Sequence, residues 1–123
     1  MASQTELINF IKNKYKWSDT EFGALKFQFK ITDDRSQLVF AWINETSIQV
    51  SSPFATTDKV TPLVALQAVS EKALGMQLMG DLYVACYYAP IADIDASEIE
   101  YALELTAFVA DELEKQLVGT DNL

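Results

Sequence analysis

Residues 25–31 have the sequence LKFQFKI, in which apolar and polar side chains alternate without a break. Successive side chains of a strand point to opposite faces, so this alternation predicts a strand with one buried face. Two more strands are expected at 37–43 and 46–52, and Pro53 is expected to end the second of these. The connections between the three strands are short, which indicates an antiparallel meander.

A capping box precedes the meander. Ser3 and Glu6 have the S-x-x-E spacing, in which the serine hydroxyl accepts from the backbone N–H three residues later. An amphipathic helix is expected from there to about Lys16, with Trp17 still on its apolar side.

Two helices and two strands are expected after the meander. They are a helix from Thr61-Pro62 to about Leu74, strands at 76–79 and 82–89, and a helix of roughly 23 residues from the capping box at 95–98 to Gly119. Gly75 is expected to take the left-handed conformation that ends a helix. The order α-β-β-β-α-β-β-α predicts one α+β domain over residues 1–123, with a five-stranded, mostly antiparallel sheet packed by helices.

Composition and charge exclude several classes of function. The chain of 123 residues contains no histidine, which excludes Ser-His-Asp and Cys-His catalysis and histidine-ligated metals. Its net charge of −9 argues against binding to nucleic acid or to anionic membranes, because both depend on neutralising phosphate. Nine acidic residues and one lysine lie between Asp93 and Asp121, whereas the first thirty residues hold five lysines. This charge separation would attract a partner that carries basic residues and orient it as it approaches.

The expected compartment is the cytoplasm. Cys86 is the one cysteine and has no intramolecular partner for a disulfide. The first seven residues lack the basic and apolar regions of a signal peptide, and no apolar run is long enough to insert into a membrane.

Three motifs suggest chemistry, and each has a simpler interpretation. Asp93, Asp95, Ser97 and Glu104 have part of the EF-hand spacing, but the required glycine is absent and helix capping explains Asp95. The pair at 33–34 could bind magnesium, although two aspartates in a hairpin are typical turn formers. The segment 14–17 alternates lysine with aromatic residues, as single-strand binders do, and also fits the end of a helix. No catalytic residue, metal site or cofactor is therefore expected.

Apolar residues exceed the needs of one core. Tyr101, Leu105 and Phe108 form a stripe opposite the buried face of the last helix, and this stripe is a candidate contact surface. The middle helix is apolar almost all round, and Ala65 and Ala68 give it a second, flat face.

The last expected strand is apolar on both faces, with Tyr83, Ala85 and Tyr87 on one of them. We expect Tyr83 and Tyr87 to contact a partner, and Ala65, Ala68 and Ala85 to permit close approach of a second copy. A five-stranded sheet with helices on one side leaves its second face to be covered. Either a third helix or a loop of the chain covers that face, or a partner or second copy does.

The segment 82–95, LYVACYYAPIADID, followed by the helix with Ala110-Asp111-Glu112-Leu113, resembles the YbjN family of bacterial proteins. The element order, small size and acidity resemble the wider type III secretion chaperone-like fold. The resemblance implies an acidic, cytosolic, non-enzymatic homodimer that holds an extended client segment, or a regulator without a known mechanism. The resemblance does not assign a functional role to any residue of this chain.

Three functions are compatible with the sequence. The leading hypothesis is a homodimeric protein-binding module, chaperone-like or regulatory, with an unknown protein client. The second is a small-molecule-sensing regulatory domain in which the tyrosine-lined sheet face and a helix enclose a ligand. The third, an enzyme that uses carboxylates alone, has the least support.

Overall fold

The computed structural model describes residues 3–72 and 74–118. The elements, in chain order, are α1 (Gln4–Lys14), β1 (Trp17–Asp19), β2 (Leu25–Lys30), β3 (Ser36–Ile43), β4 (Ser47–Thr56), α2 (Pro62–Ser70), β5 (Gly75–Met79), β6 (Leu82–Pro90), the 3-10 turn η1 (Ile91–Asp93) and α3 (Ala96–Leu117). The strands form one antiparallel sheet in the order β1-β2-β3-β4-β6-β5. The α+β prediction is confirmed, but the sheet has six strands and not five.

The additional strand is β1, a segment that the sequence placed at the end of the first helix. The helix ends at Lys14, and Trp17 pairs with Phe27 in β2. Trp17 packs against the core in this extended segment, and the Lys12 ammonium lies 4.2 Å from the centre of its ring. A helical wheel could not distinguish a helical Trp17 from a Trp17 in a strand. Its side chain is on the apolar side in the first case and packs against the core in the second. The expected extent of the first helix was therefore wrong.

The strands otherwise follow from the alternation. Leu25, Phe27 and Phe29 are buried, and the residues between them are exposed. The prediction that Pro53 ends its strand was wrong. β4 continues to Thr56 through an irregularity between Pro53 and Ala55, which absorbs the proline without ending the pairing with β6.

Capping determines where two of the helices begin. The Ser3 hydroxyl accepts from the backbone N–H of Glu6, and the Asp95 carboxylate accepts from that of Glu98. Both predicted caps are confirmed. The predicted end of the middle helix was wrong, because α2 stops at Ser70 and Gly75 begins β5 without a positive φ. The expected end of the last helix, Gly119, lies outside the described residues.

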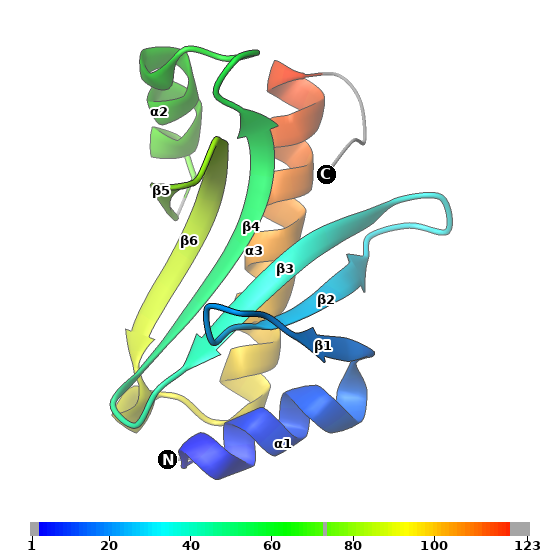
Figure 1. The fold of residues 1–123 in the computed structure, drawn as a ribbon, viewed down its shortest axis with the longest axis vertical. Coiled ribbons are helices and arrows are strands. Elements are labelled where there is room, and N and C mark those ends of the chain that lie inside the picture. The colour runs from blue at the N-terminus through cyan, green and yellow to red at the C-terminus, as the bar shows by residue number, and fades with distance from the viewer. Residues whose placement is uncertain (1–2, 73, 119–123) are drawn as a thin grey trace.

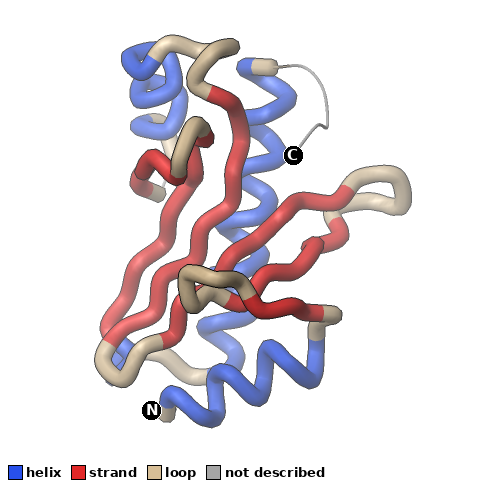
Figure 2. Tube along the Cα trace, in the orientation of Figure 1, coloured by secondary structure: helices blue, strands red, loops and turns tan. Residues whose placement is uncertain are grey.

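Helices cover one face of the sheet only (Figures 1 and 2). α3 runs behind the sheet and contacts β3, β4 and β6, while α1 lies at one end of the sheet and α2 lies beside β5. Periodicity predicts a buried stripe on α3 of Ile99, Leu103, Thr106, Ala110, Leu113 and Leu117; the first five are fully buried, and Leu117 is half-buried. The opposite face of the sheet carries no helix among the described residues. No described helix is long and apolar enough to cross a membrane.

Tyr15 follows α1 and joins this helix to the sheet. Its ring stacks on Phe27 with the ring centres 4.7 Å apart. Partial burial of the ring, and secondly the nearby carboxylates of Glu100 and Glu104, raise the pKa of Tyr15 from 10.0 to about 12. The folded state therefore holds the phenolic proton more tightly than the unfolded chain does.

This shift predicts a loss of stability in alkali. Below pH 10 the Tyr15 hydroxyl is protonated in both states, so its contribution is fully present. As the pH rises from 10 to 12, the unfolded chain ionises first, and the free energy of unfolding should fall. Tyr15→Phe should reduce this fall when urea denaturation is followed across that range. The absorbance titration of the variant should also lose a component near pH 12; ionisation of Tyr15 near pH 10 would contradict the assignment.

Candidate functional site

We call the uncovered side of the sheet the open face. Strand pairing places outward-facing residues on it that include Lys26, Gln28, Lys30, Ser36, Leu38, Phe40, Trp42, Gln49, Ser51, Gln77, Met79, Val84, Cys86 and Tyr88. This surface is mainly apolar and amide-bearing, and its two charged members, Lys26 and Lys30, both lie on β2. The face is therefore different from the solvated, charged face of an ordinary half-exposed sheet.

Four depressions lie in series on the open face. The first, of 250 Å³, shares Lys26 and Leu38 with the second, of 400 Å³. The second shares Phe22 and Met79 with the central depression, of 390 Å³. The central depression shares Gln77 with the last, also of 390 Å³, which lies beside Cys86 and Tyr88. The second and central depressions share two lining residues, and we call these two depressions the groove of the open face; the first and last also include residues of the covered side, Phe27 and Tyr87.

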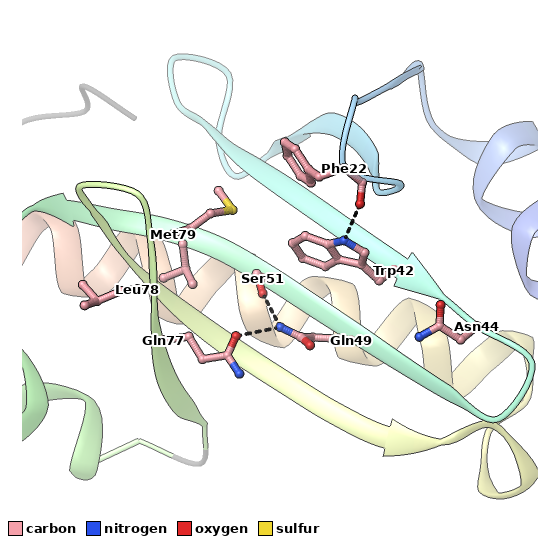
Figure 3. Close-up of a pocket in the computed structure, with 9 residues that line it drawn as sticks. Phe22, Trp42, Asn44, Gln49, Ser51, Gln77, Leu78 and Met79 are labelled. Atoms are coloured by element: carbon pink, nitrogen blue, oxygen red, sulfur yellow. Dashed lines mark hydrogen bonds between the residues drawn. The ribbon is translucent and has the colours of Figure 1, made fainter.

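Phe22 and Trp42 form one wall of the central depression (Figure 3), and with Phe40 in the adjoining depression we call them the aromatic cradle. The ring of Phe22 lies 5.6 Å from that of Phe40 and 5.8 Å from that of Trp42. Trp42 Nε1 donates to the Phe22 carbonyl oxygen at 3.4 Å, so the loop that carries Phe22 is tied to β3. Phe22 remains 54% exposed.

The loop itself is closed by local contacts. Thr20 Oγ1 donates to the Ala24 carbonyl and accepts from the Ala24 N–H, at 2.9 and 3.0 Å. Gly23 has a φ of +87°, a conformation that a side chain would strain. These features hold Phe22 over the sheet.

Side-chain amides form the floor of the central depression, as Figure 3 shows. Gln49 Nε2 donates to Gln77 Oε1 at 3.0 Å and to Ser51 Oγ at 3.4 Å. Ser51 Oγ also lies 3.3 Å from Cys86 Sγ. We call Gln49, Ser51, Gln77 and Cys86 the polar ladder. No charged side chain lines this central depression.

Cys86 has the properties of a packing residue. Burial raises the pKa of its thiol, and hydrogen bonding from Ser51 offsets this only in part. The thiolate is the nucleophilic form, so Cys86 is in its less reactive state at neutral pH.

The structure separates the five residues expected to contact a partner. Tyr83 is 1% exposed, and its hydroxyl donates to the Val60 carbonyl at 2.7 Å, so its assignment to a contact surface is corrected. Tyr87 is half-buried and packs towards the core behind the sheet. Tyr101 and Phe108 are 62% and 45% exposed on α3, as expected, and Leu105 is half-buried. The stripe therefore lies on the covered side of the sheet, away from the open face.

The three alanines assigned to a dimer contact lie in the core of the subunit. Ala65, Ala68 and Ala85 are 0%, 6% and 0% exposed. Their small side chains belong to the core cluster in which α2 packs against the sheet. The prediction for these residues is corrected, because a second copy cannot reach them.

The large residues of α2 point outwards instead. Leu63, Val64 and Leu66 are 64%, 46% and 50% exposed, and Leu78 on the neighbouring strand β5 is 65% exposed. We call these four residues the α2–β5 strip. Neither α2 nor β5 contains a charged residue.

The other motifs have structural roles. The Asp95 carboxylate caps α3 and also accepts from Ser97 Oγ at 2.8 Å, and these hydrogen bonds lower its pKa. Asp33 pairs with Lys30 across the hairpin at 3.3 Å. No group of three acidic or cysteine side chains that could hold a metal occurs within residues 3–72 and 74–118.

Sequence reasoning missed the groove residues Phe22, Trp42, Gln49 and Gln77. A usable signal existed in β3, where Leu38, Phe40 and Trp42 alternate with Val39, Ala41 and Ile43. Both faces of that strand are apolar, a pattern typical of a strand that is covered on both sides. The position of Phe22 depends on a loop and could not be found by periodicity.

Comparison with known proteins does not assign a family. No family model matches the chain, and no curated protein matches it.

Proposed function

We propose that this protein is a non-enzymatic protein-binding module, chaperone-like or regulatory, that acts as a homodimer in the cytoplasm. The observation that carries the proposal is the open face, where an apolar, amide-bearing groove lies uncovered by any described helix. An exposed apolar surface of this kind is typical of an interaction site. The proposal also extends to the type III secretion chaperone-like class, which the predicted five-strand element order resembles, and to the YbjN family, which segment 82–95 and the last helix resemble.

The α2–β5 strip supports the homodimer. A chain with a net charge of −9 repels its own copies, and this repulsion is weakest where both surfaces are uncharged. The strip lies on two uncharged elements, and β5 is an edge strand without the lysine or proline that usually protects an edge. The strip therefore replaces the buried alanines as the proposed contact between copies.

Leu63→Glu tests this contact. The substitution should weaken self-association at least about tenfold, because it places two like charges in one symmetric interface. It should preserve the fold, since Leu63 is 64% exposed and a carboxylate in the first turn of a helix is favourable. Tyr101→Glu is the matched control, because it adds the same charge at a residue 62% exposed on α3.

Sedimentation equilibrium measures both variants. We expect a dimer for the wild type and Tyr101→Glu, and a monomer for Leu63→Glu at the same concentration. A wild-type monomer at high micromolar concentration would refute the homodimer. If Tyr101→Glu alone dissociated the dimer, the contact between copies would lie on α3 and not on the α2–β5 strip.

The second candidate function is a small-molecule-sensing regulatory domain. Its support is the central depression, whose 390 Å³ falls within the usual size of ligand pockets. Native mass spectrometry of the purified protein separates the two candidates. A dimer of the sequence mass favours protein binding, whereas a retained small molecule favours the sensor.

A further inference from the structure

We propose that the central depression of the open face binds a neutral saccharide, with the apolar face of a pyranose ring stacked on Phe22 and Trp42 and its hydroxyl groups hydrogen-bonded to side-chain amides. This inference rests on the second candidate function, a small-molecule sensor, and names the class of ligand and the residues that recognise it. The ligand is placed in the central depression alone, so its recognition does not depend on the charged residues of the neighbouring depressions.

The lining of the central depression is polar but uncharged. Asn44, Gln49 and Gln77 contribute amides and Ser51 contributes a hydroxyl, and the other lining side chains are apolar. Charged residues make up 22% of the chain, yet among the described residues none lines this depression. An ionised ligand would lose its water here without meeting an opposite charge. The depression therefore favours a neutral ligand.

The amides leave hydrogen-bonding groups available to that ligand. Gln49 Nε2 donates to Gln77 Oε1 at 3.0 Å, which holds the two side chains together. The Gln49 carbonyl oxygen, the Gln77 amide nitrogen and the Asn44 amide have no partner among the described residues. Neighbouring hydroxyls of a sugar can donate to the first of these groups and accept from the second, because each hydroxyl does both. A purely apolar ligand would bury the same groups without a partner, which is costly.

The aromatic wall supplies the second half of the recognition. Phe22 and Trp42 border the depression on one side, and the amides of Gln49 and Gln77 lie across from them (Figure 3). The C–H bonds of a pyranose face are attracted to the electron-rich face of an aromatic ring. Trp42 Nε1 donates to the Phe22 carbonyl at 3.4 Å, so the wall is in place before a ligand binds. A ring that is apolar on one face and hydroxylated at its rim matches both sides of the depression.

The geometry of the wall favours a sugar over a flat heteroaromatic ligand. A nucleobase also has a hydrogen-bonding edge, but such bases are commonly held by stacking on both faces. The rings of Phe22 and Trp42 are 5.8 Å apart and inclined at 36°, so they contact each other and leave no slot between them. A pyranose needs an aromatic ring on one face only. Nucleosides therefore serve as comparison ligands in the test.

Matched probes test the class of ligand. Cellobiose, maltose and lactose are neutral disaccharides, and the best of them is compared with an analogue in which a uronic acid replaces one hexose. Binding to the full chain is measured by isothermal calorimetry at millimolar saccharide. The uronic acid should bind at least about tenfold more weakly, because the depression offers no cation and the net charge of the chain is −9. In saturation-transfer NMR, the ring protons of one pyranose face should receive more magnetisation than those of the other.

Three variants and two matched controls locate the site. Phe22→Ala, Gln49→Ala and Gln77→Ala should each weaken binding of the best saccharide by about tenfold, the loss expected for one aromatic or hydrogen-bonded contact. Gln28→Ala removes the same amide from the open face, on β2 and outside the central depression. Phe108→Ala removes the same ring from α3, where it is 45% exposed. Both controls should leave the affinity unchanged.

Every result decides between the hypotheses. Saccharide binding that is weakened by all three variants and by neither control supports the inference. Binding that is insensitive to the variants, or equal affinity for the uronic acid, overturns it. Binding of adenosine or uridine in place of the saccharides, with the same dependence on the variants, also overturns it and leaves the small-molecule sensor standing. If no saccharide binds, the inference is wrong, and the absence of any retained small molecule in native mass spectrometry would then overturn the sensor as well.

Discussion

Replacing Phe54 by alanine is expected to lower the free energy of unfolding by about 3–5 kcal/mol, the usual loss for a buried phenylalanine. Phe54 is 0% exposed, and its ring is stacked near that of Tyr83 with the centres 6.1 Å apart. It belongs to the core cluster beneath α2, which also contains Ala65 and Ala85. Truncation would leave a cavity that this small-residue packing cannot fill. Urea denaturation with an unchanged slope measures the loss.

Phe108→Ala is the matched control for the same chemical change. Phe108 is 45% exposed on α3, and its main aromatic contact is an edge contact with Phe29, with the ring centres 5.8 Å apart. Its truncation should cost about 1 kcal/mol, near the centre of the distribution for point substitutions, because the ring is only half-buried. Equal losses for the two variants would contradict the assignment of Phe54 to the core and of Phe108 to the surface stripe.

The sequence correctly predicted those helices and strands that depend on residues close to one another in the chain. The alternation in LKFQFKI places three side chains of β2 in the core, and the caps at Ser3 and Asp95 begin their helices as expected. A cap depends on atoms within three residues, and a strand with one buried face repeats every second residue. Such causes can be recognised in the sequence alone.

The failures have tertiary causes. Trp17 lies on the apolar side of a helical wheel, but pairing with Phe27 makes it a strand residue. In α2, Ala65 and Ala68 were expected to meet a second copy, and the structure buries them in the core. An all-apolar helix carries no periodic signal, so its orientation depends on how closely it packs on the sheet. Close packing favours Ala65 and Ala68 towards the core and leaves Leu63 and Leu66 outside.

Prediction of the binding surfaces also required the tertiary arrangement of the strands and helices. Tyr83 and Cys86 lie on opposite faces of β6, and only the completed sheet shows which face the helices cover. The sequence indicated that both faces avoid water, which holds for Tyr83 in the core and for the half-buried Cys86. It could not indicate that a loop residue, Phe22, would lie across β3 and make one wall of a groove.

A buried ion pair should also contribute strongly to stability. Arg35, at the β2–β3 hairpin, donates from Nε and Nη2 to Asp111 Oδ1 at 3.0 and 2.6 Å. Asp111 lies on α3 and is only 3% exposed, and its other carboxylate oxygen is 3.6 Å from Lys115 Nζ. The pair joins segments 76 residues apart, so it fixes the hairpin against the helix.

Arg35→Met is expected to lower the free energy of unfolding by about 3 kcal/mol or more, because the buried carboxylate of Asp111 loses two charge-assisted hydrogen bonds. Lys30→Met in the same hairpin removes the ion pair with Asp33. The side chains of Lys30 and Asp33 are 72% and 97% exposed, so the free energy of unfolding should change by no more than about 0.5 kcal/mol. Urea denaturation of the two variants compares replacement of the cation by methionine in a buried and in an exposed pair.

The double variant Arg35→Met with Asp111→Leu separates loss of a partner from loss of packing. If the cost of Arg35→Met comes from a buried charge, removing that charge as well should recover a substantial part of the stability, since apolar replacements of buried pairs are often neutral. The double-mutant cycle should then give a coupling free energy above about 1 kcal/mol. Additive losses would show that Arg35 acts through the packing of its side chain, and that the hairpin is held to α3 by contacts other than this ion pair.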